Sequence, residues 1–314
     1  MKNNIRENPI LRKRIGFVGI SVFRYLFLIS VSYIVIFQLL YMLTYAFRPE
    51  SDMYDNSIVW VNKINTLENF KLTWEYMDYV RTFITTLSIQ VLSALIEVIT
   101  CTLPAYGLAR FKFKGKTALF ICVMFTVIVP PQLIAVPMSL NFAYFDVLGI
   151  LKLIGGLLGT ELRPNLLGTG FTFWLPSLFG AGLRSGLFIF IYMQFFRNLP
   201  KELEEAAALD GASPFRTYTS IVLPSSGVVI LTVTILSVVW HWNDTYFSEL
   251  YFNENFPLSI MLQRVSDNMA GGLSADNRGT RMAACILFIL PVLIMYTFLQ
   301  RRFIKSIDRV GIVG

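Results

Sequence analysis

Long runs of hydrophobic residues, separated by short polar segments, dominate the pattern of this chain. A helix needs about 20 apolar residues to cross the hydrocarbon core of a bilayer, because each residue adds about 1.5 Å. Runs of this kind occur six times, at residues 24–47, 82–109, 117–145, 172–196, 225–247 and 281–300. The sequence therefore predicts an all-α membrane protein with six transmembrane helices, the first of them retained rather than cleaved as a signal peptide.

The composition agrees with this pattern. Hydrophobic residues make up 55% of the 314 positions and charged residues 15%, with a mean hydropathy of +0.59. A soluble domain carries about 25% charged residues. Cys101, Cys122 and Cys285 all lie in apolar stretches without CxxC spacing, so neither a disulfide framework nor a zinc site is expected.

The net charge of +7 is concentrated beside the apolar runs and not in a nucleic-acid-binding motif. The N-terminal segment, the 110–116 loop and the segment after residue 300 are rich in lysine and arginine, whereas the connections 48–81, 146–171 and 248–280 carry more acids. Positive charge marks the cytoplasmic side of a membrane protein. Both termini are therefore expected in the cytoplasm, and nucleic acid is not expected as a partner.

Two expected spans contain features that a plain anchor does not need. Pro130, Pro131 and Pro137 should break or kink the third span, because proline removes a backbone donor and clashes with the preceding turn. The fourth is interrupted by glycines and a charge within residues 180–186. Such irregular backbone lines a cavity or packs against protein, but small residues also serve simple helix packing. The pattern leaves both possibilities open.

Residues 198–225 predict two short helices joined by a glycine turn. Pro200 and the glutamates that follow it favour a helix start, and three alanines at 206–208 favour its continuation. Gly211 suits the left-handed C-terminal cap. Ser213 and Pro214 are typical of the start of the second helix. A hairpin with such small side chains could dock closely on another protein, although an ordinary surface loop has a similar composition.

The same segment resembles the EAA loop of bacterial ABC-importer permeases. Glu205-Ala206-Ala207, then Gly211, then nine residues, then Ile221-Val222-Leu223-Pro224 matches that loop at each signature position, between the expected fourth and fifth spans. The resemblance implies a coupling helix that sits in a groove of an ATPase subunit. It implies docking by Glu202, Glu205, Ala206, Ala207, Leu209, Asp210, Gly211, Ala212 and Phe215.

Further likeness, over roughly residues 80–314, is to the carbohydrate-uptake branch of the maltose G type. It is carried by Trp240-His241-Trp242-Asn243-Asp244, by Pro291 and by the ending FLQRRFIKSIDRVGIVG, which lacks the lysine common near the family's C-terminus. The resemblance implies the type I importer transmembrane fold. It also implies an oligosaccharide cargo and, as partners, a second homologous permease, two ATPase subunits and an extracellular solute-binding protein.

On this basis the chain divides into segments placed in a bacterial inner or plasma membrane. They are a cytoplasmic segment (1–23), a first helix (24–47), an external loop (48–81), a permease core (82–300, with the coupling loop at 198–224) and a cytoplasmic tail (301–314). The glycine-rich segment 146–171 is longer than usual for the family and is expected to form an extra external element.

Candidate pathway residues are few. Glu97 lies deep in the second expected span, where a carboxylate is costly and often functional, and Arg184 is a candidate partner for it. Trp240, Asn243 and Asp244 combine a flat apolar ring with hydrogen-bonding groups, as sugar recognition requires. An interfacial aromatic belt explains the tryptophan equally well.

Catalysis by the chain itself is not expected, nor are a metal or a cofactor. Gly115-Lys116-Thr117 mimics the end of a phosphate-binding P-loop, but the required earlier glycine is replaced by Arg110. ATP hydrolysis is therefore assigned to a partner. Two rival classes are a secondary transporter, which needs an ion-coupling site and often inverted repeats, and a membrane enzyme, which needs catalytic groups that do not stand out here.

Overall fold

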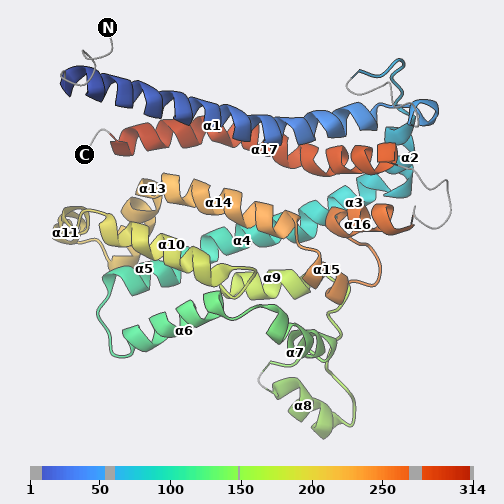
Figure 1. The fold of residues 1–314 in the computed structure, drawn as a ribbon. Coiled ribbons are helices and arrows are strands. Elements are labelled where there is room, and N and C mark those ends of the chain that lie inside the picture. The colour runs from blue at the N-terminus through green and yellow to red at the C-terminus, as the bar shows by residue number, and fades with distance from the viewer. Residues whose placement is uncertain (1–8, 54–60, 148, 269–277, 312–314) are drawn as a thin grey trace. The chain divides into compact units, whose positions relative to one another are not determined.

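The computed structural model describes residues 9–53, 61–147, 149–268 and 278–311, and every regular element within these ranges is helical (Figure 1). The predicted all-α class is confirmed. Of the expected cytoplasmic ends, residues 1–8 and 312–314 lie outside the described residues. The chain forms two compact units, residues 1–73 with 269–286 and residues 74–268 with 287–314.

The first unit contains α1 (Pro9–Ala46), the short 3₁₀ turn η1 (Glu50–Asp52), most of α2 (Glu68–Tyr76) and the start of α17 (Arg278–Gly311). Asn69 Nδ2 donates to the carbonyls of Ala46 and Arg48, at 3.0 and 2.8 Å. Thr73 Oγ1 donates to the carbonyl of Thr280 at 3.1 Å. The two bonds from Asn69 satisfy carbonyl groups at and just after the end of α1 that have no helical partners.

The second unit begins with a nearly continuous helical rod over residues 79–110. A π-helical turn and a junction at Cys101 separate its segments. These segments are α3 (Tyr79–Thr86), the π turn η2 (Leu87–Val91), α4 (Leu92–Thr100) and α5 (Thr102–Arg110). After this rod the chain forms five separate helices. They are α6 (Lys116–Ile128), α7 (Gln132–Ala143), α8 (Ile150–Leu158), α9 (Phe171–Leu178) and α10 (Ser185–Asn198).

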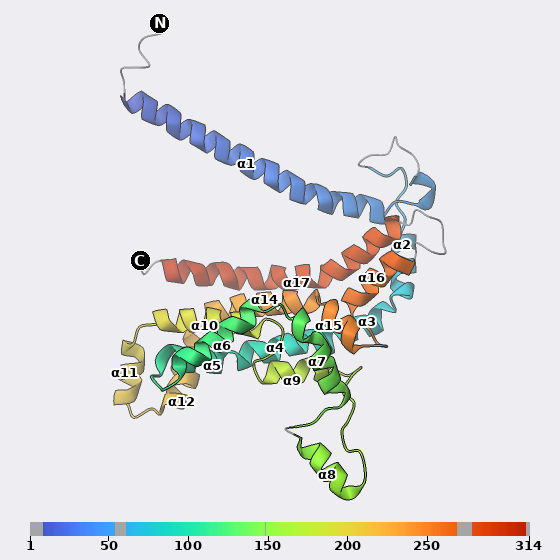
Figure 2. The same cartoon turned by 60° about the horizontal axis from the view of Figure 1, so that its bottom comes forward.

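The remaining elements of this unit start with a short hairpin. They are α11 (Glu202–Leu209), α12 (Pro214–Thr217), the π turn η3 (Tyr218–Val222), α13 (Leu223–Ser225), α14 (Gly227–Trp242), α15 (Tyr246–Tyr251) and α16 (Leu258–Asn268). Helix α10 packs on α5, and α4 packs between α9 and α14. The two views place α11 at one end of this bundle, whereas α8 projects away from it beyond α7 (Figures 1 and 2).

The irregular spans have the structure that their prolines and glycines predict. The third is bent by 100° between α6 and α7, at Pro130 and Pro131, while Pro137 is accommodated within α7. The fourth is divided into α9 and α10, with left-handed backbone at Gly180 and Arg184.

Three described helices are long and apolar enough to cross a membrane without interruption: Ile20–Ala46, Tyr79–Arg110 and Arg278–Gln300. Two bent pairs, α6 with α7 and the 214–225 segment with α14, raise this number to five. The remaining expected crossing, 172–196, corresponds to the broken pair α9 and α10. Broken helices are compatible with a membrane interior only where they face protein or water.

Candidate functional site

The hairpin of α11 and α12 is closed by a complete helix-capping motif. Gly211 has φ +76°. Its N–H donates to the carbonyl of Ala208 at 3.1 Å, and the N–H of Ala212 donates to the carbonyl of Ala207 at 2.9 Å. These two bonds define a Schellman motif, which a residue with positive φ makes possible. The predicted glycine turn is therefore present, and a Cβ at Gly211 would meet nothing within 4 Å.

The second helix of the hairpin starts as its sequence predicts. Ser213 is in extended conformation, and its side chain accepts from the N–H of Arg216 at 3.3 Å. Pro214 occupies the first turn, where its missing N–H is not needed. Local capping on both sides thus gives the turn a single conformation.

The hairpin is attached to the end of the bundle by polar contacts. Arg110, at the end of α5, forms an ion pair with Glu204 of α11 at 2.8 Å and donates to the carbonyl of Leu199 at 2.6 Å. On the other side of the turn, the hydroxyls of Tyr218 and Thr102 are hydrogen-bonded at 2.6 Å. Both ends of the hairpin are therefore connected to the same helix, α5.

The outer face of the hairpin is uncovered, and large apolar side chains stand there beside acidic ones. Leu209 is 90% exposed and Phe215 is 67% exposed. The other expected docking residues on this face are also exposed, namely Glu202, Glu205, Ala206, Asp210 and Gly211, with Ala212 half-buried. Leu209 and Phe215 are thus free to contact a partner in this arrangement.

Ala207 differs from this expectation. It is only 4% exposed, because it lies on the inner side of α11 within the chain's own packing. Its small side chain lets the helix lie close to the rest of the hairpin, so it cannot contact a partner directly in this arrangement. Periodicity along α11 could have shown this, since Ala207 lies on the same side as Glu204, which pairs with Arg110.

A second feature is a buried polar network in the middle of the bundle. Glu97 of α4 is fully buried and lies 3.0 Å from Nε2 of His241 on α14. Ser237 Oγ donates to the same carboxylate at 3.1 Å, and Ser185 Oγ also bonds to it. The expected partner of Glu97, Arg184, is not among these contacts. The structure does not form that pair, since Arg184 is exposed whereas Glu97 is fully buried and held by other side chains.

The network continues toward the far end of α14. His241 Nδ1 lies 3.3 Å from Oε1 of Gln90, and Gln90 Nε2 donates to Ser248 Oγ at 2.7 Å. Ser248 Oγ in turn donates to Asp244 at 2.8 Å. Glu97 and Asp244, two of the candidate pathway residues, are thus connected through buried side chains, whereas Asn243 is exposed and Trp240 half-buried.

The central pair is satisfied by its neighbours. The Gln90 carbonyl oxygen can only accept, so Nδ1 of His241 donates to it. Glu97 and His241 are both fully buried and are hydrogen-bonded to each other and to polar side chains around them. This explains how two ionisable groups are accommodated at a depth where an unpaired charge is costly.

The break between α9 and α10 lies directly over this pair. A Cβ added at Gly182 would come within 2.6 Å of Ser177 Oγ and 3.0 Å of Glu97 Oε1. Glycine is needed here because the backbone passes so close to the buried carboxylate. The adjacent Arg184 is exposed, and its guanidinium lies 5.8 Å from the centre of the Trp240 ring.

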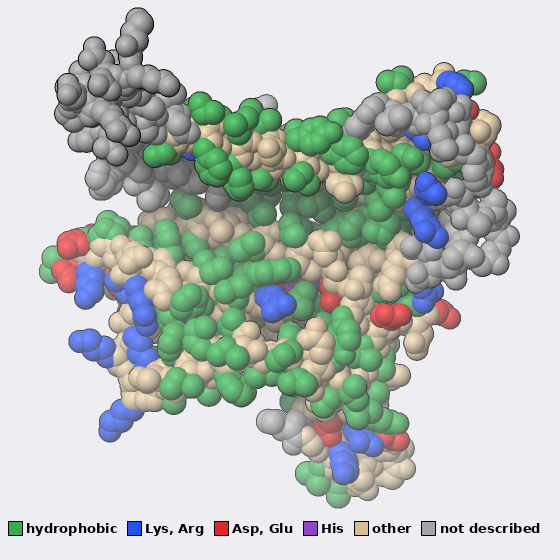
Figure 3. Space-filling model, viewed as in Figure 1, with side chains coloured by type: hydrophobic (Ala, Val, Ile, Leu, Met, Phe, Trp, Pro, Cys, Tyr) green, Lys and Arg blue, Asp and Glu red, His purple; other side chains and the backbone are tan. Residues whose placement is uncertain are grey.

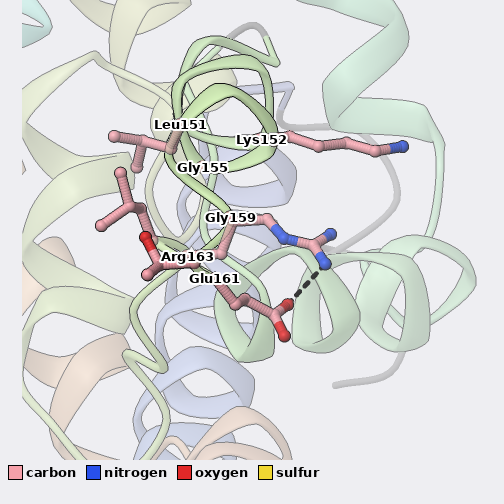
Figure 4. A pocket seen from close by; sticks show the side chains of 9 residues that line it. Leu151, Lys152, Gly155, Gly159, Glu161 and Arg163 are labelled. Carbon is pink, nitrogen blue, oxygen red and sulfur yellow. Dashed lines mark hydrogen bonds and ion pairs between the residues drawn. The ribbon is translucent and has the colours of Figure 1, made fainter.

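The 146–171 segment forms a separate projection around α8. Asp146 caps this helix, accepting from the N–H of Leu151 and of Lys152 at 2.8 and 3.1 Å. A cavity of about 270 Å³ lies between α8 and residues 159–163, beside an ion pair of Arg163 and Glu161 at 2.5 Å (Figure 4). Leu157 on this helix is 81% exposed.

Comparisons with known proteins agree with this architecture. The chain is 28% identical to protein LplC of Bacillus subtilis (strain 168) over 296 residues, which is 90% of both chains. It is 29% identical over 264 residues to the melibiose/raffinose/stachyose import permease protein MelC of the same organism, covering 83% of this chain and 86% of MelC.

A solved structure shows the same fold. The crystal structure of a bacterial ABC transporter involved in the import of the acidic polysaccharide alginate matches 93% of this chain and 98% of its own, with a TM-score of 0.68 and 16% identity. The model of one protein family matches residues 101–309, more than half of the chain. The protein therefore belongs to the family of binding-protein-dependent transport system inner membrane components.

Proposed function

We propose that the chain is the permease subunit of an ATP-driven importer for carbohydrate, with an oligosaccharide as its cargo. Family membership supports the transport role. The cargo is supported by the names of relatives, which include a probable starch degradation products permease of Thermoanaerobacterium thermosulfurigenes (28% identical) and a diacetylchitobiose permease of Streptomyces coelicolor (25% identical).

The observation that carries the proposal is the uncovered outer face of the α11–α12 hairpin, with two large apolar side chains among acidic ones. Leu209 and Phe215 present large hydrophobic surfaces on either side of a turn that is capped at Gly211 and Ser213. Burying such side chains in a partner's groove would give binding free energy at a small entropic cost, because the segment is already ordered. The proposed occupant of this face is an ATPase subunit.

Charge distribution supports a cytoplasmic position for this hairpin. Basic side chains gather at the α11 end of the bundle (Figure 3), and the 110–116 loop is joined to α11 through Arg110 and Glu204. Cytoplasmic connections of membrane proteins carry such an excess of lysine and arginine. The proposed topology therefore has both termini and the hairpin inside, and α8 outside, where a solute-binding protein delivers the cargo.

The hairpin is connected to several helices of the bundle, so a displacement of the hairpin would displace them too. It follows α10 directly and leads through η3 and α13 into α14, and it is tied to α5 by Arg110 and by the Tyr218–Thr102 bond. When the ATPases close, a push on the docking face would move α5, α10 and α14 together. A second, homologous permease would complete the pathway, so that the two halves rock between inward- and outward-open states.

ATP hydrolysis is assigned to two partner subunits. The sequence Gly115-Lys116-Thr117 stands at the start of α6, after a loop that follows another helix. A P-loop follows a strand and needs backbone amides arranged around the phosphates. The described structure offers no strand before this loop, so the likeness to a P-loop carries no function.

The test is reconstitution in proteoliposomes of the chain with its partner permease, ATPases and binding protein. The probes are radiolabelled raffinose, a neutral trisaccharide, and trigalacturonate, an acidic one. Uptake of either that requires ATP, and stops with a hydrolysis-deficient ATPase, is the expected result. Uptake that follows an ion gradient and continues without ATP would support the rival secondary transporter and overturn the proposal.

A further inference from the structure

Arg184 occupies an unusual place for a charged side chain. It caps the N-terminus of α10, whose 14 residues span about 21 Å from there to the end that leads into the α11 hairpin. With the hairpin at the cytoplasmic surface, this distance puts Arg184 within the depth of the bilayer core. The face of the molecule over α9 and α10 is largely hydrophobic (Figure 3), yet Arg184 is exposed on the chain's surface.

The backbone at this position is also unfavourable for arginine. Arg184 has φ +67° and ψ +14°, a left-handed conformation that glycine adopts with little strain and other residues adopt at a cost. Glycines stand close by at positions 180, 182 and 186. Glycine would therefore meet the conformational demands of the turn at Arg184 better than arginine does. Its side chain must serve a purpose outside this turn.

No acid of the described residues neutralises Arg184. Glu97, the partner that the sequence suggested for Arg184, is already hydrogen-bonded to His241, Ser237 and Ser185. Within the described part of the chain Arg184 forms no ion pair and donates no side-chain hydrogen bond. All five guanidinium N–H donors are thus available to a group that does not belong to these residues.

Trp240 holds the guanidinium in position. The Arg184 guanidinium carbon lies 5.8 Å from the centre of the indole, within cation–π range. The indole itself is half-buried and packs on Phe188, with ring centres 5.6 Å apart. A fixed, planar fork of donors is the arrangement that binds a carboxylate in bidentate fashion.

From these observations we infer that Arg184, oriented by Trp240, is a recognition point for the carboxylate of an acidic saccharide on its way through the permease. This inference rests on the proposed function and narrows its cargo. A neutral sugar offers no negative charge to this guanidinium. A uronate supplies a counterion and also occupies the donors.

The experiment uses the complete reconstituted importer and a matched pair of probes, radiolabelled trigalacturonate and the same trimer after reduction of its carboxyl groups. Arg184→Gln is expected to lower the rate of trigalacturonate uptake about tenfold or more, the range for losing a charge-assisted hydrogen bond. Uptake of the carboxyl-reduced trimer should change by less than about twofold. Arg184→Gly should give the same difference between the probes, and because glycine relieves the strained backbone it keeps the fold.

Arg197→Gln is the matched control. Arg197 is an exposed arginine at the opposite end of α10, 5.9 Å from the ring of Phe120. Like Arg184, it is exposed, belongs to an end of α10 and contacts an aromatic ring, but it lies at the end near the hairpin. Its loss should therefore lower the uptake of both probes equally and only slightly.

Four results would overturn the inference. Equal losses with both probes in Arg184→Gln would assign Arg184 a general role, and loss of the co-purifying partner permease would make it an ion pair between the two permeases. Wild-type uptake of raffinose without uptake of trigalacturonate would contradict acid recognition while the proposed function stands. ATP-dependent uptake of neither saccharide would contradict both.

Discussion

The α11–α12 hairpin and the Glu97 network differ in which groups they satisfy and which they leave exposed. The hairpin satisfies its backbone locally, through the caps at Gly211 and Ser213, and leaves its apolar side chains uncovered. The network buries polar side chains and satisfies them with groups far away in the sequence, such as His241 and Gln90. The first arrangement prepares a surface for a partner. The second fixes helices α4, α10 and α14 against one another.

The largest expected effect tests the buried region. Glu97→Ala should lower the free energy of unfolding by about 3–5 kcal/mol, because it leaves His241 buried without its partner. Equilibrium unfolding of the purified permease in detergent measures this. The paired change Glu97→Leu with His241→Phe removes both polar groups and should cost much less. Additive losses in the double variant would show that the two residues do not act as a pair.

The next effect tests the exposed region. Leu209→Glu should reduce the amount of ATPase that co-purifies with the permease about 30-fold, because a central apolar anchor of an interface contributes about 2 kcal/mol or more. Its unfolding should not change. Leu157→Glu on α8 is the control, since Leu157 is similarly exposed but lies on the projection away from the hairpin. Retention of the ATPase by the Leu209 variant would remove the docking role from this face.

A third experiment separates the two sides of α11 itself. Ala207→Asp places a charge on the buried side and should destabilise the hairpin, seen as faster proteolysis between α10 and α14. Ala206→Asp places the same charge on the exposed side, so it should leave proteolysis unchanged and weaken ATPase binding. If the two variants behave alike, the distinction between an inner and an outer side is wrong.

The smallest effect concerns the turn. Gly211→Val should cost about 1–2 kcal/mol of hairpin stability, because a β-branched residue is strained at φ +76° although space is available around it. Gly211→Asn should cost less, since asparagine tolerates left-handed backbone. ATP-dependent raffinose uptake by the two variants is compared. Equal uptake in both would show that backbone conformation at Gly211 does not matter for coupling.

The contrast between the regions also explains what sequence could predict. The hairpin was predictable because its signals are local: Gly211, Ser213 and Pro214 each act within one turn of the chain. The breaks at Pro130 and at Gly180 were predictable for the same reason. Six apolar runs gave the helical class, although bending leaves three of the described helices as uninterrupted spans.

The buried network could not be predicted in the same way. Glu97 and His241 lie 144 residues apart, and no local rule assigns a lone acid to a lone histidine rather than to Arg184. The only available indication of their pairing was that one acid and one histidine each occur within an apolar span. The π turns at η2 and η3, and the inward position of Ala207, depend on packing between helices and have no local signature as clear as a cap.

The most direct measurement of the central claim is site-specific photo-crosslinking in the assembled importer, with a photoreactive amino acid in place of Leu209 or Leu157. The account predicts a covalent adduct between position 209 and an ATPase subunit, and none between position 157 and that subunit. Failure to crosslink at 209, or equal crosslinking at both positions, would contradict a docking role for the hairpin.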